Sequence, residues 1–175
     1  MVPLKANTLA GLWGDDVTLS DFNLITDRTQ SDVDRHAELK AKGWQGMTND
    51  EKNEWKTSLK GAYNYTDMNR VESAVEYVAN KLTEVGYVVL PNVKKDWNGA
   101  DKPTLDDIKR YMKNVADIRA TLAVLSTTPD APTTEKKLNY QTANAMEQIL
   151  IDVDDLISRM TSAYFYSGDL YSGEV

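Results

Sequence analysis

Three stretches of the chain place apolar residues at alternating spacings of three and four, which is the spacing of one helix face. The stripes consist of Met68, Val71, Val75, Val78, Leu82 and Val85; of Ile108, Tyr111, Val115, Ile118, Leu122 and Leu125; and of Met146, Ile149, Val153, Leu156 and Met160. They predict three long helices, over about 66–85, 104–125 and 140–164. Because this spacing favours left-handed helix packing, the stripes form either an intramolecular core or an intermolecular coiled coil.

Two shorter helices precede these three, over about 29–42 and 48–61. Helix starts are indicated by residues whose side-chain oxygen can accept from the first free backbone N–H groups. The predicted N-caps are Thr29, Thr48, Thr66 and Thr104, and the predicted stops are Gly43, Gly61 and Gly86. Thr48 also forms a capping box with Glu51.

Residues 1–28 and 165–175 show no helical period. The first range has scattered apolar residues among glycine and proline, with Val17–Leu24 strand-like in part, and the last range is aromatic and punctuated by glycine. The sequence therefore predicts a mostly α protein: an elongated bundle of three long and two short helices (29–164) with an extended N-terminal arm (1–28) and a short β-like C-terminal tail (165–175). The arm buries little by itself, so we expect it to lie on the bundle or on a neighbouring molecule.

Two of the long helices begin with similar residues. The pattern Tyr65-x-x-x-Asn69-x-Val71-Glu72 recurs as Tyr140-x-x-x-Asn144-x-Met146-Glu147, 75 residues further along the chain. Both occurrences lie in the first turns of their helices. The match indicates either a duplicated helical unit or a chance similarity of four positions.

Length and charge narrow the class of protein. With 175 residues, of which 41% are hydrophobic, the chain suits one domain with a buried core. A net charge of -7 argues against binding to nucleic acid or to an anionic membrane, because both attract a basic surface. The absence of cysteine excludes disulfides, thiol catalysis and cysteine-ligated metal. No apolar run approaches the roughly 18 residues that span a bilayer, and the first 16 residues lack the apolar region of a signal peptide.

The chain shows no catalytic motif. His36 is the only histidine, no nucleotide-binding glycine motif is present, and no serine lies in a nucleophile elbow. The acidic residues Asp152, Asp154 and Asp155 diverge around a helix, and the stretch Asp96–Asp101 has the wrong residues at the fifth and sixth positions of a calcium loop, so a turn is the better interpretation. We therefore expect no enzyme activity, no cofactor and no metal, and a packing or surface role for His36.

Aromatic residues outside the stripes are the candidate interface of this sequence. Tryptophan and tyrosine anchor protein interfaces and stack on sugar rings. The candidates are Trp13, Trp44 and Trp97 in the arm and loops, and Tyr164, Phe165, Tyr166 and Tyr171 near the C-terminus. The three tryptophans are staples that pin loops onto the bundle, partner contacts or glycan platforms, whereas Trp55 shares a stripe with Leu59 and Ala62 and is expected in the core.

Several strings of the chain resemble a known family. They are Ile25-Thr26-Asp27-Arg28-Thr29-Gln30-Ser31-Asp32-Val33-Asp34, Lys42-Gly43-Trp44, Met47-Thr48, Lys60-Gly61-Ala62-Tyr63-Asn64-Tyr65-Thr66-Asp67-Met68-Asn69-Arg70-Val71-Glu72, Asp96-Trp97, Pro103-Thr104, Arg110-Tyr111, Asn114-Val115, Leu122-Ala123-Val124-Leu125 and Tyr166-Ser167-Gly168-Asp169-Leu170-Tyr171-Ser172-Gly173-Glu174. Together these strings, over about residues 25–175, resemble a family of helical virion proteins encoded in the tail or fibre gene regions of phages and prophages of Gram-positive, Clostridia-like bacteria.

The resemblance implies a non-enzymatic structural protein of a phage or prophage virion, as a tail, baseplate or fibre component. It implies a location on the particle after assembly in the host cytoplasm, other virion proteins as partners, and several copies arranged with cyclic symmetry. Two alternatives stay open within the same resemblance. One is a module that binds a host-surface glycan or protein during adsorption, and the other is a head fibre or decoration protein.

A physical role can be attached to five residues of these strings. Asp27 and Arg28 mark the change from arm to helix, where a hydrogen-bonded or ion-paired corner would set the direction of the arm. Asn69, Arg70 and Glu72 lie in the first turns of the next long helix, where Asn69 can bind a loop carbonyl. We expect these five residues to form a structural corner, and we expect assembly contacts in the arm and the tail.

Overall fold

The computed structural model describes residues 17–101, 103–133 and 138–168, with side chains described up to residue 163. Its helices are the short 3-10 helix η1 (Leu19–Phe22), α2 (Gln30–Gly46), α3 (Asn49–Thr57), α4 (Tyr65–Glu84), α5 (Leu105–Thr121) and α6 (Tyr140–Gly168). No β-strand occurs among the described residues. The prediction of a mostly α protein is confirmed.

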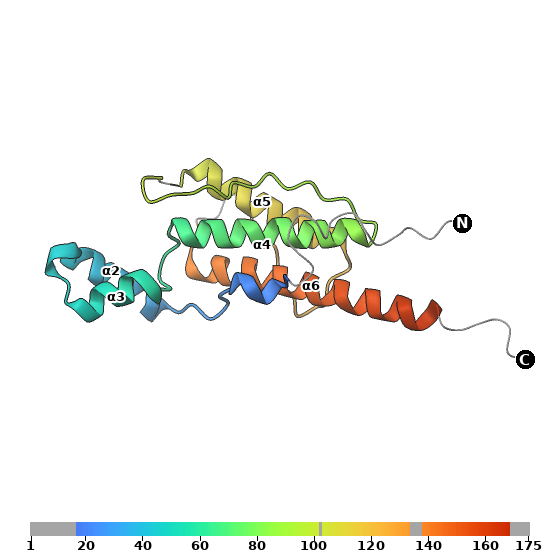
Figure 1. Ribbon diagram of the computed structural model, residues 1–175, viewed down its shortest axis with the longest axis horizontal. Coiled ribbons are helices and arrows are strands. Elements are labelled where there is room, and N and C mark those ends of the chain that lie inside the picture. Colours follow the sequence, from blue (N-terminus) through green and yellow to red (C-terminus); the bar gives the residue numbers. More distant parts are fainter. Residues whose placement is uncertain (1–16, 102, 134–137, 169–175) are drawn as a thin grey trace, which may run out of the picture.

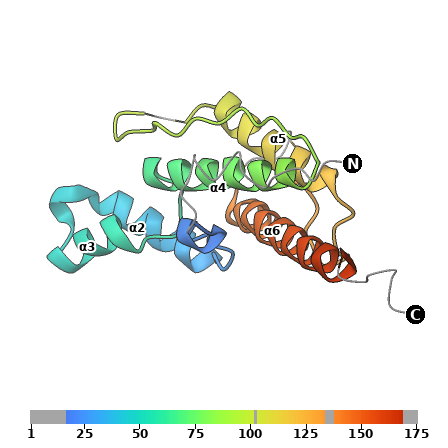
Figure 2. The ribbon, with the colours of Figure 1, turned by 45° about the vertical axis from the view of Figure 1, so that its right-hand side comes forward.

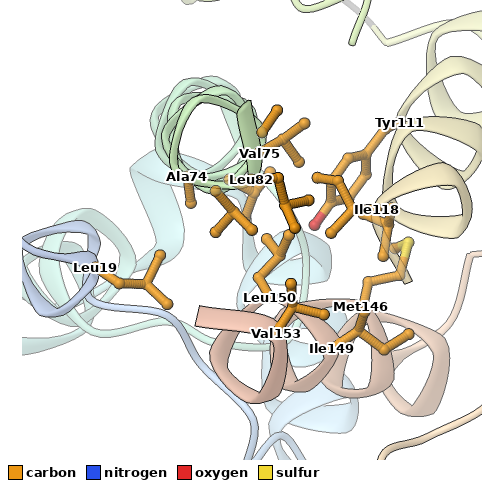
Figure 3. Close-up of a cluster of buried hydrophobic side chains, with 14 of the residues drawn as sticks. Leu19, Ala74, Val75, Leu82, Tyr111, Ile118, Met146, Ile149, Leu150 and Val153 are labelled. Atoms are coloured by element: carbon orange, nitrogen blue, oxygen red, sulfur yellow. The ribbon is translucent and has the colours of Figure 1, made fainter. Parts of the chain in front are cut away.

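Helices α4, α5 and α6 form the main body, which we call the bundle body (Figure 1). Their apolar stripes meet in one core, shown in Figure 3, and the stripe residues there are almost all inaccessible to solvent. The core contains Val71, Val75, Val78, Leu82, Tyr111, Val115, Ile118, Met146, Ile149 and Val153. Each large side chain buried in this way contributes about 1.5–3 kcal/mol. Since these side chains are buried within a single chain, the stripes form an intramolecular core.

The helix ends follow local capping rules. Thr29, Thr48 and Thr104 each form a capping box with an acidic residue three positions later. Helix α4 differs from the prediction, because Asn64 and not Thr66 is its N-cap: Asn64 Oδ1 accepts from the backbone N–H groups of Thr66 (2.8 Å) and Asp67 (3.0 Å). At the other end of α4, Gly86 has a φ of 96°, the left-handed conformation predicted for the residue that ends this helix.

Helices α2 and α3 pack on each other and project from one end of the bundle body (Figures 1 and 2). Gly43 breaks α2 with φ 64° and ψ 162°, so the predicted stop is present, but one further turn follows it up to Gly46. Arg35 joins the two helices through both oxygens of Glu54, at 3.0 and 2.7 Å. The His36 ring stacks on Trp55 at 5.3 Å, and burial lowers the pKa of His36.

The prediction that Trp55 is a core residue, on a stripe with Leu59 and Ala62, is wrong. Helix α3 ends at Thr57, so neither of those two residues continues its face. Trp55 is only partly buried and lies outside the main core cluster. The physical reason is the small size of the α2–α3 pair, which cannot enclose a tryptophan by itself.

Over residues 17–28 the predicted N-terminal arm lies on the bundle, and its strand-like part is corrected. Leu19–Phe22 is a 3-10 helix and not a strand, and Leu19 is a buried member of the core. Phe22 and Leu24 pack against the same cluster (Figure 3 shows Leu19 beside α4 and α6). The part of the arm from residue 17 to residue 28 therefore belongs to the fold, because α4 and α6 leave an apolar seam that these side chains fill.

Two helix ends differ from the expected boundaries. Helix α5 ends at Thr121, before the predicted stripe residues Leu122 and Leu125. Leu122 and Val124 instead pack against the core at a spacing of two, the period of extended chain, and Leu125 is 51% exposed. Helix α6 continues to Gly168, four residues into the predicted tail, because no helix-breaking residue precedes that glycine. Residues 169–175 lie outside the described part of the chain.

Gly61 lies against the start of α2. A Cβ atom at this position would lie 2.1 Å from the backbone oxygen of Asp32 and 2.8 Å from the Cβ of His36. We expect Gly61→Ala to lower the free energy of unfolding by about 1–3 kcal/mol, because backbone atoms must move to admit the methyl group. Urea denaturation followed by circular dichroism measures the change.

Gly46→Ala is the matched control for this prediction, because its added Cβ would meet nothing closer than 3.7 Å. We expect that variant to unfold like the wild-type protein. Equal stabilities for the two alanine variants would show that the contact between residue 61 and α2 is not maintained in solution.

Candidate functional site

Glu147 on α6 lies at the centre of a buried hydrogen-bond network. Its carboxylate is fully buried and accepts four hydrogen bonds from distant parts of the chain. The N-terminal segment supplies the Ile25 backbone N–H at 2.6 Å and the Arg28 guanidinium at 2.7 Å. The Tyr63 hydroxyl (2.7 Å) and the Arg70 guanidinium (2.8 Å) complete the set. One carboxylate thus joins α6, the start of α4 and the N-terminal segment.

Asn144, one turn before Glu147, binds the same segment. Its side-chain amide accepts from the Arg28 backbone N–H (3.1 Å) and donates to the Arg28 carbonyl (2.9 Å). Arg70 also donates to the carbonyl of Asn23 at 3.0 Å. We call Asn144, Glu147 and Arg70 the Glu147 clamp, and the segment that they hold is Asn23–Arg28. The clamp contacts mainly backbone atoms, which fixes the extended conformation and the register of the segment.

Charges of opposite sign meet at this site. Two guanidinium groups, those of Arg28 and Arg70, share the carboxylate of Glu147. Burial opposes the charge of Arg70, but its hydrogen bond and charge interaction with Glu147 outweigh that effect and raise its pKa. Removal from water, the nearby Tyr111 and the charge of Glu147 raise the pKa of Tyr63 well above its ordinary value, so its hydroxyl stays protonated and can donate.

A second buried carboxylate, Glu72 on α4, has the same kind of surroundings. It accepts the Lys94 backbone N–H at 2.6 Å and the indole N–H of Trp97 at 3.1 Å. Both terminal nitrogens of Arg110 donate to it, Nη2 at 2.8 Å. This hydrogen bonding to Glu72, ahead of the opposing effect of burial, raises the pKa of Arg110. Arg110 also donates to the carbonyl of Asn92 at 2.8 Å.

Asn69 completes this second arrangement. Its side-chain amide accepts from the Trp97 backbone N–H and donates to the Trp97 carbonyl, both at 2.8 Å. The contact to a loop carbonyl that the sequence indicated for Asn69 is therefore present. We call Asn69, Glu72 and Arg110 the Glu72 clamp, and the segment that they hold is Asn92–Trp97.

The two clamps share the same set of contacts to their segments. In each, an arginine binds the carbonyl of the first segment residue (Asn23 or Asn92), and a glutamate binds the N–H two residues later. An asparagine three residues before that glutamate binds both backbone groups of the sixth segment residue, Arg28 or Trp97. In both clamps the side chain of that sixth residue also donates to the glutamate.

This correspondence supports the duplication alternative for the repeated helix pattern. Both held segments have the form Asn-apolar-x-x-Asp, a second repeat that the analysis of the sequence missed. Asn64 and Asn139, which precede the repeated tyrosines, each accept from backbone N–H groups at the start of their helix. Chance similarity would not be expected to reproduce the helix pattern, the segment pattern and their mutual contacts together.

The Glu72 clamp has one additional contact. Asn114 on α5 accepts from the Asn92 backbone N–H at 3.1 Å and donates to the Asn92 carbonyl at 2.7 Å. Among the described residues, no side chain binds both backbone groups of Asn23 in this way; its N–H binds the Ser20 carbonyl instead. The N-terminal segment is therefore held by fewer contacts than its counterpart.

The structure places the five predicted corner residues in or beside these clamps. Arg28 and Arg70 meet at Glu147, whereas Asn69 and Glu72 belong to the other clamp. Asp27 lies outside both and forms a surface ion pair with Lys60 at 2.8 Å. Glu147 itself was not predicted as a site residue, although the repeated pattern contained it. The position of Glu72 in that pattern was the signal that could have identified it.

The predicted interface residues differ in their exposure and in whether the structure describes them. Trp97 is 4% exposed and lies under the Lys94 amine, so it is a staple and not an interface residue. Trp44 is 45% exposed on the projecting α2–α3 pair, with the amines of Lys52 and Lys56 over its ring. Trp13 and Tyr171 lie outside the described residues. The backbone of Tyr164, Phe165 and Tyr166 continues α6, and their side chains lie outside the described part.

The described residues also bear on metal binding, membrane spans and acid–base chemistry. They contain no group of three or more histidine or acidic side chains positioned to hold a metal ion. The stretch around Asp96–Asp101 is a turn, closed by a hydrogen bond from the Asp101 N–H to the Asn98 carbonyl. No helix in the described part is long and apolar enough to cross a membrane. The buried carboxylates are fully engaged in holding chain segments, so neither is available as a general base.

Comparisons with protein-family models, with curated proteins and with solved structures find no significant match to this chain.

Proposed function

We propose that this protein is a non-enzymatic structural component of a phage or prophage virion, in a tail, baseplate or fibre, where several copies assemble. The strings that resemble the virion family support the proposal, and one structural observation carries it. Arg28, Asn69, Arg70, Glu72 and Arg110 belong to those strings, and all five bond chain segments to the bundle body. The residues shared with the family therefore serve the fold, which supports a structural role.

Mass spectrometry of gradient-purified particles from an induced or infected producing strain tests the proposal. We expect abundant peptides of this chain in the particle fraction, in a fixed ratio to known tail proteins. An abundant cytoplasmic host protein, depleted from the same fraction, serves as the control for contamination. Presence in the lysate combined with absence from particles would overturn the virion assignment.

A second candidate function is attachment to a host-surface glycan or protein. The exposed Trp44 on the projecting α2–α3 pair favours it, since an accessible indole ring can stack on a sugar. Titration with soluble cell-wall glycan should then change tryptophan fluorescence saturably, and Trp44→Phe should abolish the change. A flat titration of the wild-type protein would remove glycan binding by this residue.

A further inference from the structure

We propose that copies of this protein are joined by exchange of the N-terminal segment, so that Asn23–Arg28 of one chain occupies the Glu147 clamp of a second copy. The inference rests on the proposed function for its premise that several copies assemble. The partner is thus another molecule of this chain, and the contact between molecules is one that a single molecule already contains.

The N-terminal segment, α2 and α3 follow one another along the chain, and we call them the N-terminal unit (residues 17–61). Asp27 pairs with Lys60 at 2.8 Å, which ties the end of the segment to the chain that leaves α3. Gly61 lies directly against the backbone of Asp32 at the start of α2. These contacts connect the end of the held segment and the start of α2 to the last residues of the unit, so these parts can move together.

The connection between the N-terminal unit and the bundle body is short. Gly61 contacts α2, whereas Tyr63 belongs to the bundle body through its hydrogen bond to Glu147 and its edge contact with Tyr111. Between them lies only Ala62, which is exposed. Short connections of this kind favour exchange of an identical element between copies. Figures 1 and 2 show α2 and α3 projecting beyond the bundle body, which leaves room for the unit to turn.

The Glu147 clamp needs an occupant that supplies two donors to its carboxylate. The carboxylate of Glu147 is fully buried and takes two of its four donors from the segment, so an empty clamp would leave a poorly compensated buried charge. The N-terminal unit of another copy restores these contacts, together with those of Leu19, Phe22 and Leu24 with the core. The closed and exchanged forms therefore have the same contacts and differ mainly at Ala62.

The Glu72 clamp shows why exchange is specific to the N-terminal segment. Its own segment, Asn92–Trp97, is joined to α4 on one side and to α5 on the other, and both helices belong to the same core. Asn114 adds two further hydrogen bonds to it. A segment tethered at both ends cannot leave for a neighbour without unfolding the bundle body, whereas the N-terminal unit can.

Cross-linking between single-cysteine chains tests the exchange. Ser20 and Ser158 are both exposed and line the same hollow between the N-terminal segment and α6. Because the chain has no cysteine, S20C and S158C each introduce one thiol. The two full-length variants, carrying different affinity tags, are co-expressed, purified together and treated with a short bis-maleimide. Exchange predicts a covalent dimer that carries both tags.

Two controls make the result decisive. The S20C/S158C double variant reports a segment in its own clamp, as a product cross-linked within one chain. Co-expressed S31C and S158C give the background from random collisions, since Ser31 is exposed at the start of α2 and outside that hollow. Internal cross-linking of the double variant, with no two-tag dimer above that background, would overturn the proposal.

The same experiment separates the exchange from the virion assignment. Particles that contain the chain while the mixed variants give no two-tag dimer would contradict exchange and leave the proposed function intact. A two-tag dimer from a chain that is absent from particles would support exchange and contradict the proposed function. Insertion of Gly-Ser-Gly after Ala62 gives an independent readout: a longer connection should favour closed single chains and lower the yield of the dimer.

Discussion

Glu147→Ala is expected to lower the free energy of unfolding by about 3–5 kcal/mol, the usual cost of removing one partner from a buried ion pair. The substitution leaves Arg28, which is 5% exposed, without its carboxylate, and it removes the acceptor of the Ile25 N–H. Arg70 and Tyr63 also lose an acceptor. Urea denaturation followed by circular dichroism at the helix band should show the loss as a lower midpoint.

Asp155→Ala is the matched control on the same helix. Asp155 is exposed and pairs with Arg159 at 2.6 Å, an interaction between side chains at the surface. Its loss is expected to cost no more than about 0.5 kcal/mol, because water solvates both partners well. Similar midpoints for the two variants would show that the Glu147 clamp contributes little to the stability of the fold. Glu147→Gln, which keeps part of the hydrogen bonding, should fall between them.

Glu72→Ala is expected to produce a comparable loss, about 3–5 kcal/mol, with an additional spectroscopic signature. Both the Arg110 guanidinium and the Trp97 indole N–H depend on Glu72 for their buried acceptor. Release of the segment would expose Trp97 to water, so its fluorescence emission should shift to longer wavelength in the folded state. Subtraction of the spectrum of Trp97→Phe variants isolates its emission from that of the other three tryptophans.

The control for this second prediction is Glu76→Ala, one turn further along α4. Glu76 pairs with Lys95 of the same loop at 2.5 Å, but both side chains are more than a quarter exposed. We expect a small change in stability and no shift of the emission. An unshifted spectrum for Glu72→Ala would mean that the remaining contacts of the loop, including those of Asn69 and Asn114, are enough to hold it.

The carboxylate of Glu147 also explains why residues 17–28 of the predicted arm lie on the bundle body. Residues 17–28 have no helical period, and a segment without a period is commonly an extended arm. The structure incorporates it into the fold because Arg28 and the Ile25 N–H satisfy Glu147, and because Leu19 completes the core. None of these contacts gives the segment a hydrophobic period of its own.

The repeated pattern in α4 and α6 was visible in the sequence, but its meaning was not. Asn69 and Glu72 recur as Asn144 and Glu147 at the same spacing, which puts both side chains on one helix face. Whether that face meets solvent, core or another segment depends on the path of the chain. The path brings an extended segment to each face, and the equivalence of the two sites became recognisable only from these contacts.

Helix positions were determined largely by the sequence itself. The apolar stripes of α4, α5 and α6 and the threonine caps depend on residues that are only a few positions apart. They therefore favour these helices without any contact from distant parts of the chain. The pairing of the buried charges was decided by the tertiary structure alone. Glu147 takes its donors from residues between 77 and 122 positions away, and nothing local distinguishes it among 27 acidic residues. Whether a carboxylate is paired is decided only when the whole chain has folded, because the same tertiary contacts bury the carboxylate and supply its donors.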